Sequence, residues 1–250
     1  MPSNGVVSAL SSLEKLSIVD LTHTLIEGIP HFPTHTSYRH VPCVNPLDPA
    51  LMFSLELHEH TGTHLDAPMH YLKEISNLDI TKHSVSAIQI KNMFGICKVL
   101  NIKPDQDNLI SKDSVMAWEV SNQTSIAHYD FLFFYFGWEH KWSADESNIE
   151  FTKNWPGLSR DCCEYILKKN SKIKGVGTDC LGLDSWKSSD IPAHDLFLQK
   201  NILIYENLNN LSKLVDVDQF LFIAFPLKIF KGSGSPIRAI AFIDKKGNDD

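Results

Sequence analysis

The chain has 250 residues, 43% of them hydrophobic and 21% charged, so it is long enough to bury a large core as a globular protein. Its formal net charge of −7 argues against nucleic acid as a partner, because phosphate backbones are bound by clustered Lys and Arg. The longest apolar runs lie at 131–138 and 220–227, well short of the roughly 18 residues that span a bilayer. We expect one domain over 1–250 that binds neither nucleic acid nor a membrane.

Both ends of the chain lack strong structural signals. Residues 1–13 are rich in serine and small residues, and 245–250 are polar, so both segments are predicted to be loosely held. The N-terminus lacks the basic start and long apolar block of a secretory signal, which predicts a cytoplasmic protein. The five cysteines are an odd number without a CxxC pair, and they are expected to be free buried thiols.

Apolar and β-branched runs predict more strands than helices. The predicted strands are 16–21, 53–57, 98–102, 131–136, 201–206, 220–225 and 238–243. Residues 53–57 alternate between apolar and polar, which predicts one buried face, whereas the uninterrupted apolar runs 131–136 and 202–205 predict burial on both faces. Helices are predicted at 111–121 and at 159–170, the latter with Ser159 as its N-cap. The fold class is therefore α/β, with a large mixed sheet and flanking helices.

The segment 58–70, HEHTGTHLDAPMH, has the residue types of a metal centre. Its glycine and proline oppose a helix, so the chain is expected to turn at Gly62 and continue extended. Side chains two apart in extended chain share a face, so His64 and Asp66 point the same way and a bend can return His60 to them. Two imidazoles and a carboxylate suit a divalent ion with an open position, zinc first, then manganese or iron. A polar His-rich loop is the alternative interpretation.

The same segment carries a family resemblance. Its final eleven residues match the signature HxGTHxDxPxH of the cyclase family, which includes bacterial-type kynurenine formamidases and isatin hydrolase. Further stretches that resemble the family, in the right order, are 18–33, 136–142, 174–184, 191–211 and 231–242. The resemblance thus covers about residues 16 to 243. It implies a barrel-like mixed sheet with flanking helices, of the swivelling β/β/α type, and a homodimer or homotetramer.

The resemblance also implies roles for individual residues. The implied metal ligands are His60, His64, Asp66, His194 and Glu206, with Asp66 bridging two ions. Glu206 has support of its own, because a carboxylate that follows an apolar run is costly to bury unless a cation balances it. An exposed glutamate at a strand end and a surface histidine at position 194 are the alternatives. His70 is implied to carry protons, which suits an imidazole that titrates near neutral pH, and a hydrogen-bonded loop histidine is its alternative.

The predicted function is hydrolysis of an amide C–N bond in a small aromatic substrate, such as an N-formylkynurenine-like formamide, with water activated by one or two Zn²⁺ ions or by Mn²⁺. Hydrolysis of a cyclic amide or lactone, as by isatin hydrolase, is one alternative, and a non-catalytic binding or regulatory protein is another. Residues 33–51 match the formamidases only loosely, which leaves the substrate open. His23 and His31 could line the pocket or be exposed. Trp138, Trp142 and Trp186 could belong to the core or to the pocket wall.

Overall fold

The computed structural model of the protein describes residues 4–43, 50–71, 80–145 and 149–245. Its strands are β1 (Ser17–Asp20), β2 (Arg39–Cys43), β3 (Met52–Glu56), β4 (His64–Asp66), β5 (Phe94–Leu100), β6 (Leu109–Ile110), β7 (Phe131–Phe134), β8 (Gly157–Leu158), β9 (Gly175–Thr178), β10 (Leu203–Glu206), β11 (Phe220–Pro226) and β12 (Gly234–Ile243). The α-helices are α1 (Asn4–Leu13), α2 (Lys112–Ser121) and α3 (Arg160–Lys169). Short helices are η1 (Pro68–Tyr71), η2 (Ile80–His83), η3 (Val85–Ala87), η4 (Ile90–Asn92), η5 (Ile126–His128), η6 (Trp138–Lys141), η7 (His194–Leu198) and η8 (Leu211–Leu214). Within the described ranges, no helix has the length and apolar character that crossing a membrane requires.

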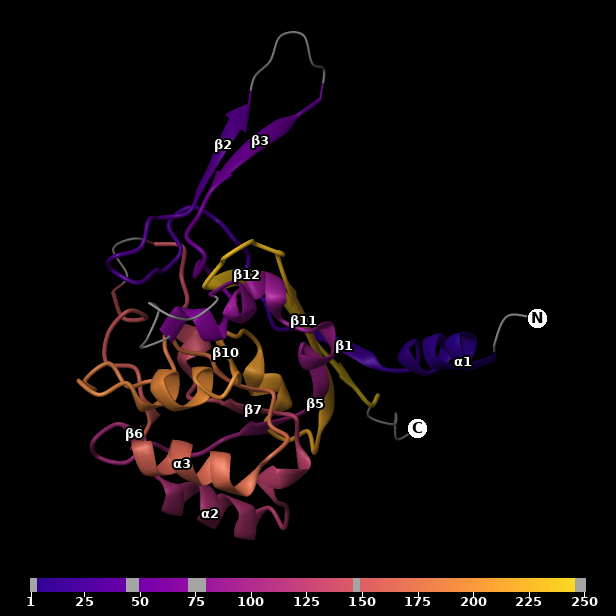
Figure 1. The fold of residues 1–250 in the computed structure, drawn as a ribbon, viewed down its shortest axis with the longest axis vertical. Coiled ribbons are helices and arrows are strands. Elements are labelled where there is room, and N and C mark those ends of the chain that lie inside the picture. Colours follow the sequence, from indigo (N-terminus) through magenta and orange to yellow (C-terminus); the bar gives the residue numbers. More distant parts are fainter. Residues whose placement is uncertain (1–3, 44–49, 72–79, 146–148, 246–250) are drawn as a thin grey trace.

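The main sheet closes on itself. Its strand order is β1-β12-β11-β5-β7-β9-β10-β4, and β4 also pairs with β12, which closes a ring of seven strands and leaves β1 as an additional strand on β12. Neighbours from β5 through β7 and β9 to β10 run parallel, and the other pairs of this sheet are antiparallel. The expected mixed α/β fold with a barrel-like core is confirmed (Figure 1).

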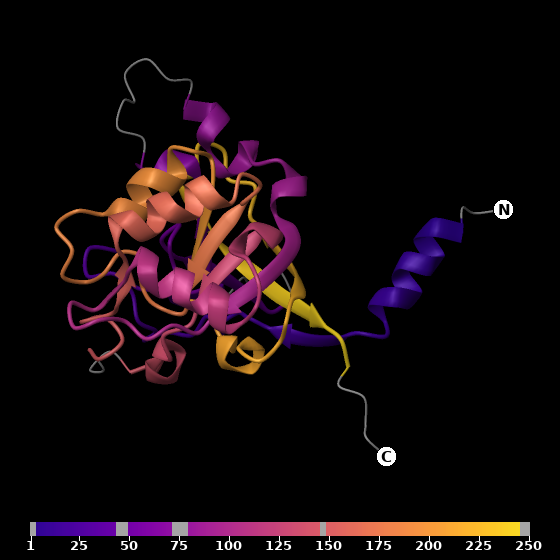
Figure 2. The same cartoon turned by 90° about the horizontal axis from the view of Figure 1, so that it is seen from below.

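Strand β7 divides its side chains between two cores. Phe131 and Phe133 point into the barrel, where each packs on the ring of Phe222. Leu132 and Phe134 point outward into a second core that includes residues of α2 and α3. These two helices lie side by side against the body (Figures 1 and 2). The prediction that 131–136 and 202–205 are buried on both faces is confirmed for those of their residues that lie in β7 and β10.

The two predicted helices begin at serine caps. The Ser159 hydroxyl accepts a hydrogen bond from the Cys162 amide at 3.4 Å, and Ser111 accepts one from the Ser114 amide at 3.2 Å. Each bond satisfies an amide that the first turn of a helix leaves without a partner. The caps therefore place the starts of α2 and α3 where the sequence predicts them.

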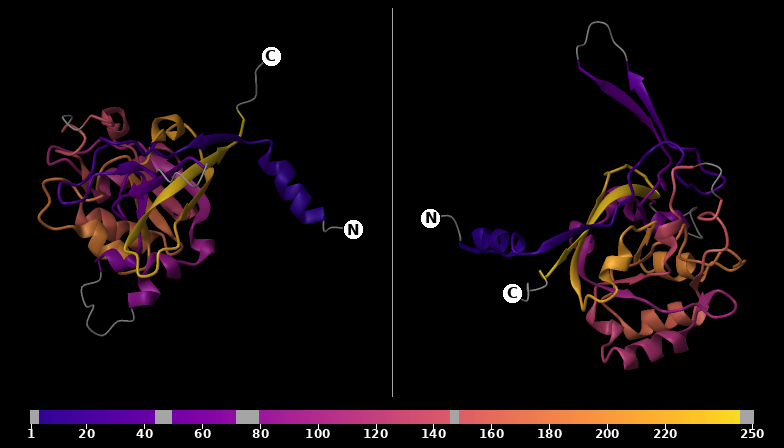
Figure 3. Two further views of the ribbon diagram at one scale, coloured as in Figure 1. Left: turned by 90° about the horizontal axis from the view of Figure 1, so that it is seen from above. Right: turned by 180° about the vertical axis from the view of Figure 1, so that it is seen from behind.

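Two elements project from the body, the helix α1 and the hairpin of β2 and β3 (Figures 1 and 3). The prediction of one buried face for residues 53–57 is wrong, because every residue of β3 is exposed and its partner among the described strands is β2. The expected loose segment 1–13 contains α1, which the sequence did not predict. At the other end, Lys245 is exposed outside any strand, and 246–250 lie outside the described residues.

All five cysteines are free thiols, as expected. Four of them are buried, but Cys43 is exposed on the projecting strand β2, so the expectation of burial is wrong at that position. Burial raises the pKa of the Cys162 thiol, which disfavours the reactive thiolate. The buried cysteines therefore belong to the packed core.

Candidate metal-binding and catalytic site

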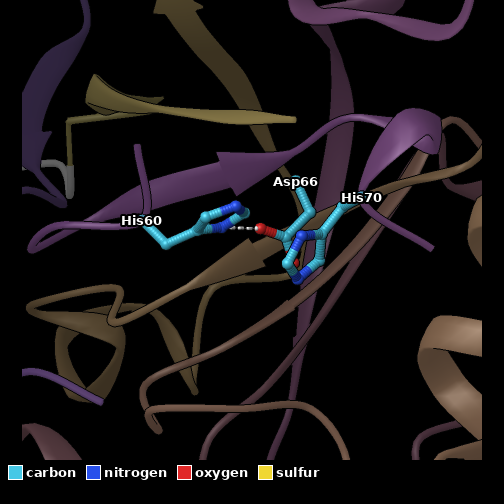
Figure 4. Close-up of side chains that lie close together, drawn as sticks. All are labelled: His60, Asp66 and His70. Carbon is cyan, nitrogen blue, oxygen red and sulfur yellow. Dashed lines mark ion pairs between the residues drawn. The ribbon is translucent and has the colours of Figure 1, made fainter. Parts of the chain in front are cut away.

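Strand β4 and the turn before it bring three predicted ligands together. His64 and Asp66 are two positions apart on β4, so their buried side chains lie on the same side. Gly62 has a φ of +63°, in the left-handed region that favours glycine, and it turns the chain between β4 and His60. The Nδ1 atom of His60 then lies 2.6 Å from Oδ1 of Asp66 (Figure 4). The arrangement has the turn and the shared face that the sequence predicts.

The remaining two predicted ligands come from distant segments. Glu206 is the last residue of β10, where it pairs with His64 across the sheet, and only 5% of it is exposed. Its Oε2 atom lies 3.4 Å from Nε2 of His64. His194 begins η7, and its Nε2 atom lies 3.5 Å from both Asp66 Oδ2 and Glu206 Oε1. The other four predicted ligands thus lie around the carboxylate of Asp66.

Two imidazoles of this cluster are oriented by partners outside it. His64 donates its Nδ1 hydrogen to the Gly62 carbonyl at 2.9 Å, and His60 Nε2 lies 3.0 Å from the Ser233 hydroxyl. The second nitrogen of each ring faces Asp66. Metal-ligating histidines show this pattern, because the outer hydrogen bond fixes the ring and leaves the other nitrogen available to the ion.

Asp184 orients the third imidazole. Its carboxylate accepts hydrogen bonds from the Ala193 amide at 2.7 Å, from the His194 amide at 3.2 Å and from His194 Nδ1 at 2.5 Å. The Nε2 atom of His194 is thereby aimed at Asp66 and Glu206. Sequence reasoning missed Asp184 as a functional residue, although it ends the stretch 174–184 that resembles the family. No spacing rule in the sequence connects it to His194.

The segment before β12 also fits closely against the site. The Ser233 hydroxyl donates to Glu59 Oε2 at 2.7 Å, which holds it beside His60. A Cβ atom on Gly234 would lie 2.5 Å from Cε1 of His60, so a larger residue would displace the ring. Gly234 pairs with Asp66 where β12 meets β4. The pairing of β12 with β4, which closes the barrel, therefore helps to position the ligands. The sequence did not predict this role.

The charge balance at Asp66 points to a cation. The residue is completely buried, and neither carboxylate oxygen accepts a well-formed hydrogen bond from a described residue. Burial by itself would raise the Asp66 pKa, but the facing imidazoles, His60 first among them, hold the pKa well below its usual range. Burial would likewise lower the His194 pKa, but Asp184 and Asp66 raise it well above the usual value. A buried, ionised carboxylate without hydrogen-bond donors fits a bound divalent ion.

His70 lies within reach of the same carboxylate. Two sets of ligand atoms are close enough to hold an ion each, namely His60, Asp66 and His70, and His64, Asp66 and Glu206. The His70 ring lies in η1, with its centroid 4.1 Å from that of His60 (Figure 4). Burial lowers the pKa of His70 to about 4, so the ring is neutral at pH 7. Its position suits a ligand as well as the implied proton carrier, and the two roles differ in whether replacing it releases metal.

A cavity of about 370 Å³ opens over this cluster. Its aromatic wall is formed by Phe32, Tyr71, Trp155 and Trp186, and its floor by His60, His64, His70, His194 and Glu206. Cavities of this volume bind small molecules, and flat aromatic walls suit a substrate with a ring. The site therefore combines a metal-type ligand cluster with a pocket for a small molecule.

The residues that line the cavity answer questions that the sequence left open for several tryptophan and histidine residues. Trp186 belongs to its wall, whereas His23 and His31 are not among its lining residues. His23 is buried instead against Trp142, with ring centroids 4.0 Å apart. His35, to which the sequence gave no role, does line the cavity. It lies in the loosely matching region 33–51, where sequence reasoning had no motif to follow.

The chain is similar to several known proteins in sequence and in fold. The family model described as "Putative cyclase" matches residues 19–185. Isatin hydrolase of Roseibium aggregatum is 33% identical over 201 residues, covering 76% of this chain and 73% of that protein. Kynurenine formamidase of Erythrobacter litoralis is 24% identical, covering 89% and 92%. The crystal structure of an isatin hydrolase bound to the product analogue thioisatinate superposes with a TM-score of 0.81 at 25% identity, covering 98% of this chain and 100% of that one.

These relatives are hydrolases, which supports a hydrolytic role for this chain, and its ligand cluster suggests a bound metal. The matched region contains the complete HxGTHxDxPxH segment, and the fold agrees over nearly the whole length. The chain therefore belongs to the cyclase family.

Proposed function

We propose that this protein is a metal-dependent hydrolase that cleaves an amide C–N bond of a small aromatic substrate. The observation that carries the proposal is the buried Asp66 carboxylate, which no described residue supplies with a well-formed hydrogen bond but which three individually oriented imidazoles face. The proposed ligands are His60, His64, Asp66, His194 and Glu206, with Zn²⁺ as the first candidate ion and Mn²⁺ as the second. A divalent ion bound there would polarise a substrate carbonyl and acidify a water molecule.

The protein's own groups supply binding and proton transfer. The aromatic wall would hold the substrate ring against Trp155 and Trp186, whose rings meet edge to face at 4.9 Å. His70, beside His60 on the cavity floor, would take a proton from the attacking water and return it to the departing nitrogen. The unpaired cysteines support a reducing compartment such as the cytosol.

Two classes of amide substrate are candidates for this site. A formamide such as N-formylkynurenine would yield formate and an amine, as the sequence predicts. Ring opening of a cyclic amide such as isatin is the second candidate, and it is favoured by the 33% identity to isatin hydrolase. We would measure kcat/KM of the metal-loaded protein for N-formylkynurenine, isatin and simple lactones. Turnover of none of the amides, at full metal occupancy, would contradict the proposal.

Single substitutions separate the ligands from the proton carrier. His64→Ala should lose both metal and turnover, because it opens the cage around the ion. His70→Asn should keep metal while its rate falls roughly 10²- to 10⁴-fold, the usual contribution of a positioned acid–base group. The exposed His128, remote from the cluster, provides the control, and His128→Asn should change neither property. If His70→Asn releases metal, His70 is a ligand and another group moves the proton.

A further inference from the structure

His35 lines the cavity over the ligand cluster, although the sequence gave it no role. It lies in the loop between β1 and β2. Its Nδ1 atom is buried, yet it has no hydrogen-bond partner among the residues that the structure describes. Burying a hydrogen-bonding nitrogen without a partner costs free energy, because water no longer satisfies it. A molecule bound in the cavity can supply the missing partner.

Aromatic neighbours hold the His35 ring in place. The ring stacks on that of His58, with centroids 3.8 Å apart and an angle of 9° between the planes. The ring of Phe32, which also lines the cavity, lies 5.3 Å away. His58 is tied to the turn before β4, because its Nδ1 atom accepts a hydrogen bond from the His60 amide at 3.3 Å. The His35 ring is therefore fixed beside the predicted ligand His60, with ring centroids 6.0 Å apart.

Two other polar groups of the cavity lining already have partners within the protein. The Nε1 atom of Trp155 donates a hydrogen bond to the Asp184 carbonyl at 2.7 Å. The Ser185 hydroxyl donates one to the Trp155 carbonyl at 3.4 Å. Because these donors are occupied and the buried nitrogen of His35 is not, His35 is the better placed to bind a polar atom of a substrate.

The chemistry of the candidate substrates indicates which atom His35 would meet. N-formylkynurenine and isatin both carry a ketone on the ring carbon next to the one that bears the amide nitrogen. When the amide carbonyl lies at the ligand cluster, this ketone is a second polar group, and an aromatic wall cannot satisfy its oxygen. A neutral imidazole has one N–H donor, and one of its two tautomers places the hydrogen on Nδ1.

We propose that His35 is a substrate-binding residue that donates a hydrogen bond to this ketone, and that the substrate class is an anilide with a ketone ortho to its nitrogen. The inference rests on the proposed function, which places the amide at the ligand cluster. His35 determines specificity and does not hold the ion, since it belongs to neither of the two sets of described residues that are close enough to bind one.

Two formamides that differ in one group test the hydrogen bond. ortho-Acetylformanilide has the ketone, and ortho-isopropenylformanilide has a CH₂ group in place of the ketone oxygen. The preference of the metal-loaded protein for the first, expressed as a ratio of kcat/KM values, should fall about 5- to 100-fold in His35→Phe, the range expected for one buried hydrogen bond. A difference in intrinsic reactivity cancels, because the same pair is compared in both proteins.

Two further variants separate the hydrogen bond from a general effect on the loop. His35→Asn should recover part of the preference, because its side-chain NH₂ group can donate in place of Nδ1–H. His128→Phe is the control, because His128 is exposed and does not line the cavity, and it should keep the full preference. The metal content of all three variants should equal that of the unaltered protein.

Binding of the amine products separates this inference from the hydrolase proposal. Calorimetric titration of the metal-loaded protein with ortho-aminoacetophenone and with ortho-isopropenylaniline requires no turnover. The unaltered protein should bind the first more tightly, and His35→Phe should bind the two alike. If neither formamide is hydrolysed but this binding preference holds, the proposed function fails while the recognition of the ketone by His35 stands. Equal preferences in the unaltered protein and His35→Phe, release of metal by His35→Phe, or no binding of either amine would overturn the inference.

Discussion

Asparagine in place of Asp184 tests whether the orientation of His194 determines metal binding. The aspartate accepts three hydrogen bonds, two from backbone amides and one from the His194 ring. An asparagine has one acceptor oxygen, and its NH₂ group would face one of these donors. Loss of such support weakens metal affinity or activity about 10- to 100-fold. That range equals about 1.4 to 2.7 kcal/mol of binding free energy.

Competition with a chromogenic chelator would measure this loss directly. Asp195→Asn is the matched control, because Asp195 adjoins His194 but directs its carboxylate toward Arg160, 3.6 Å away. The control should keep the metal affinity of the unaltered protein. Denaturant unfolding of the metal-free proteins would measure any general destabilisation separately. The reasoning is refuted if Asp184→Asn lowers the unfolding free energy but binds metal as tightly as the control.

Three further predictions concern close packing, pH and the core. Gly234→Ala should push the His60 ring aside and lower metal affinity at least about tenfold in the same titration, whereas Gly5→Ala, whose Cβ meets open space, should not. Burial lowers the pKa of His23 from 6.5 to about 4. The free energy of unfolding should therefore decrease as the pH falls from 6.5 toward 4, because the unfolded chain binds a proton in this interval that the folded protein does not. His23→Phe should therefore flatten the dependence of unfolding free energy on pH in that interval by up to about 3 kcal/mol, and an unchanged slope would contradict this. Phe222→Ala, in the barrel interior, should lower the unfolding free energy by about 3 to 5 kcal/mol in denaturant titration.

The sequence predicts those parts of the site that depend on local geometry. Two-residue spacing places His64 and Asp66 together, and Gly62 supplies the turn that brings His60 to them. Asp184 could not be predicted in the same way. It is a single carboxylate in a loop, and its contact with His194 depends on how that loop packs rather than on a periodic pattern.

In the fold, too, local sequence patterns predict some elements and not others. Long apolar runs predict both β7 and β11, although only β7 is buried on both faces, and β11 alternates between buried and partly exposed side chains. Strand β9, with the sequence GVGT, has no such run and was missed. The alternation of apolar and polar residues in 53–57 indicates a strand, but it does not show whether another element covers the apolar side chains. The prediction of a buried face for this strand, which belongs to the projecting hairpin, was therefore wrong. Helix α1 was missed because serine and glycine are weak helix formers.

The pairing of β4 with both β10 and β12 links the order of folding to the ligand cluster. Asp66 pairs with Ile204 on one side and with Gly234 on the other, so the cluster forms only after residues far apart in the chain have met. Contacts of such long sequence separation form slowly. An ion held by this cluster binds the finished barrel and not the unfolded chain, and it stabilises the finished state by mass action. The supply of metal in the cell would therefore influence how much of the newly made protein survives, as well as how fast the surviving molecules work.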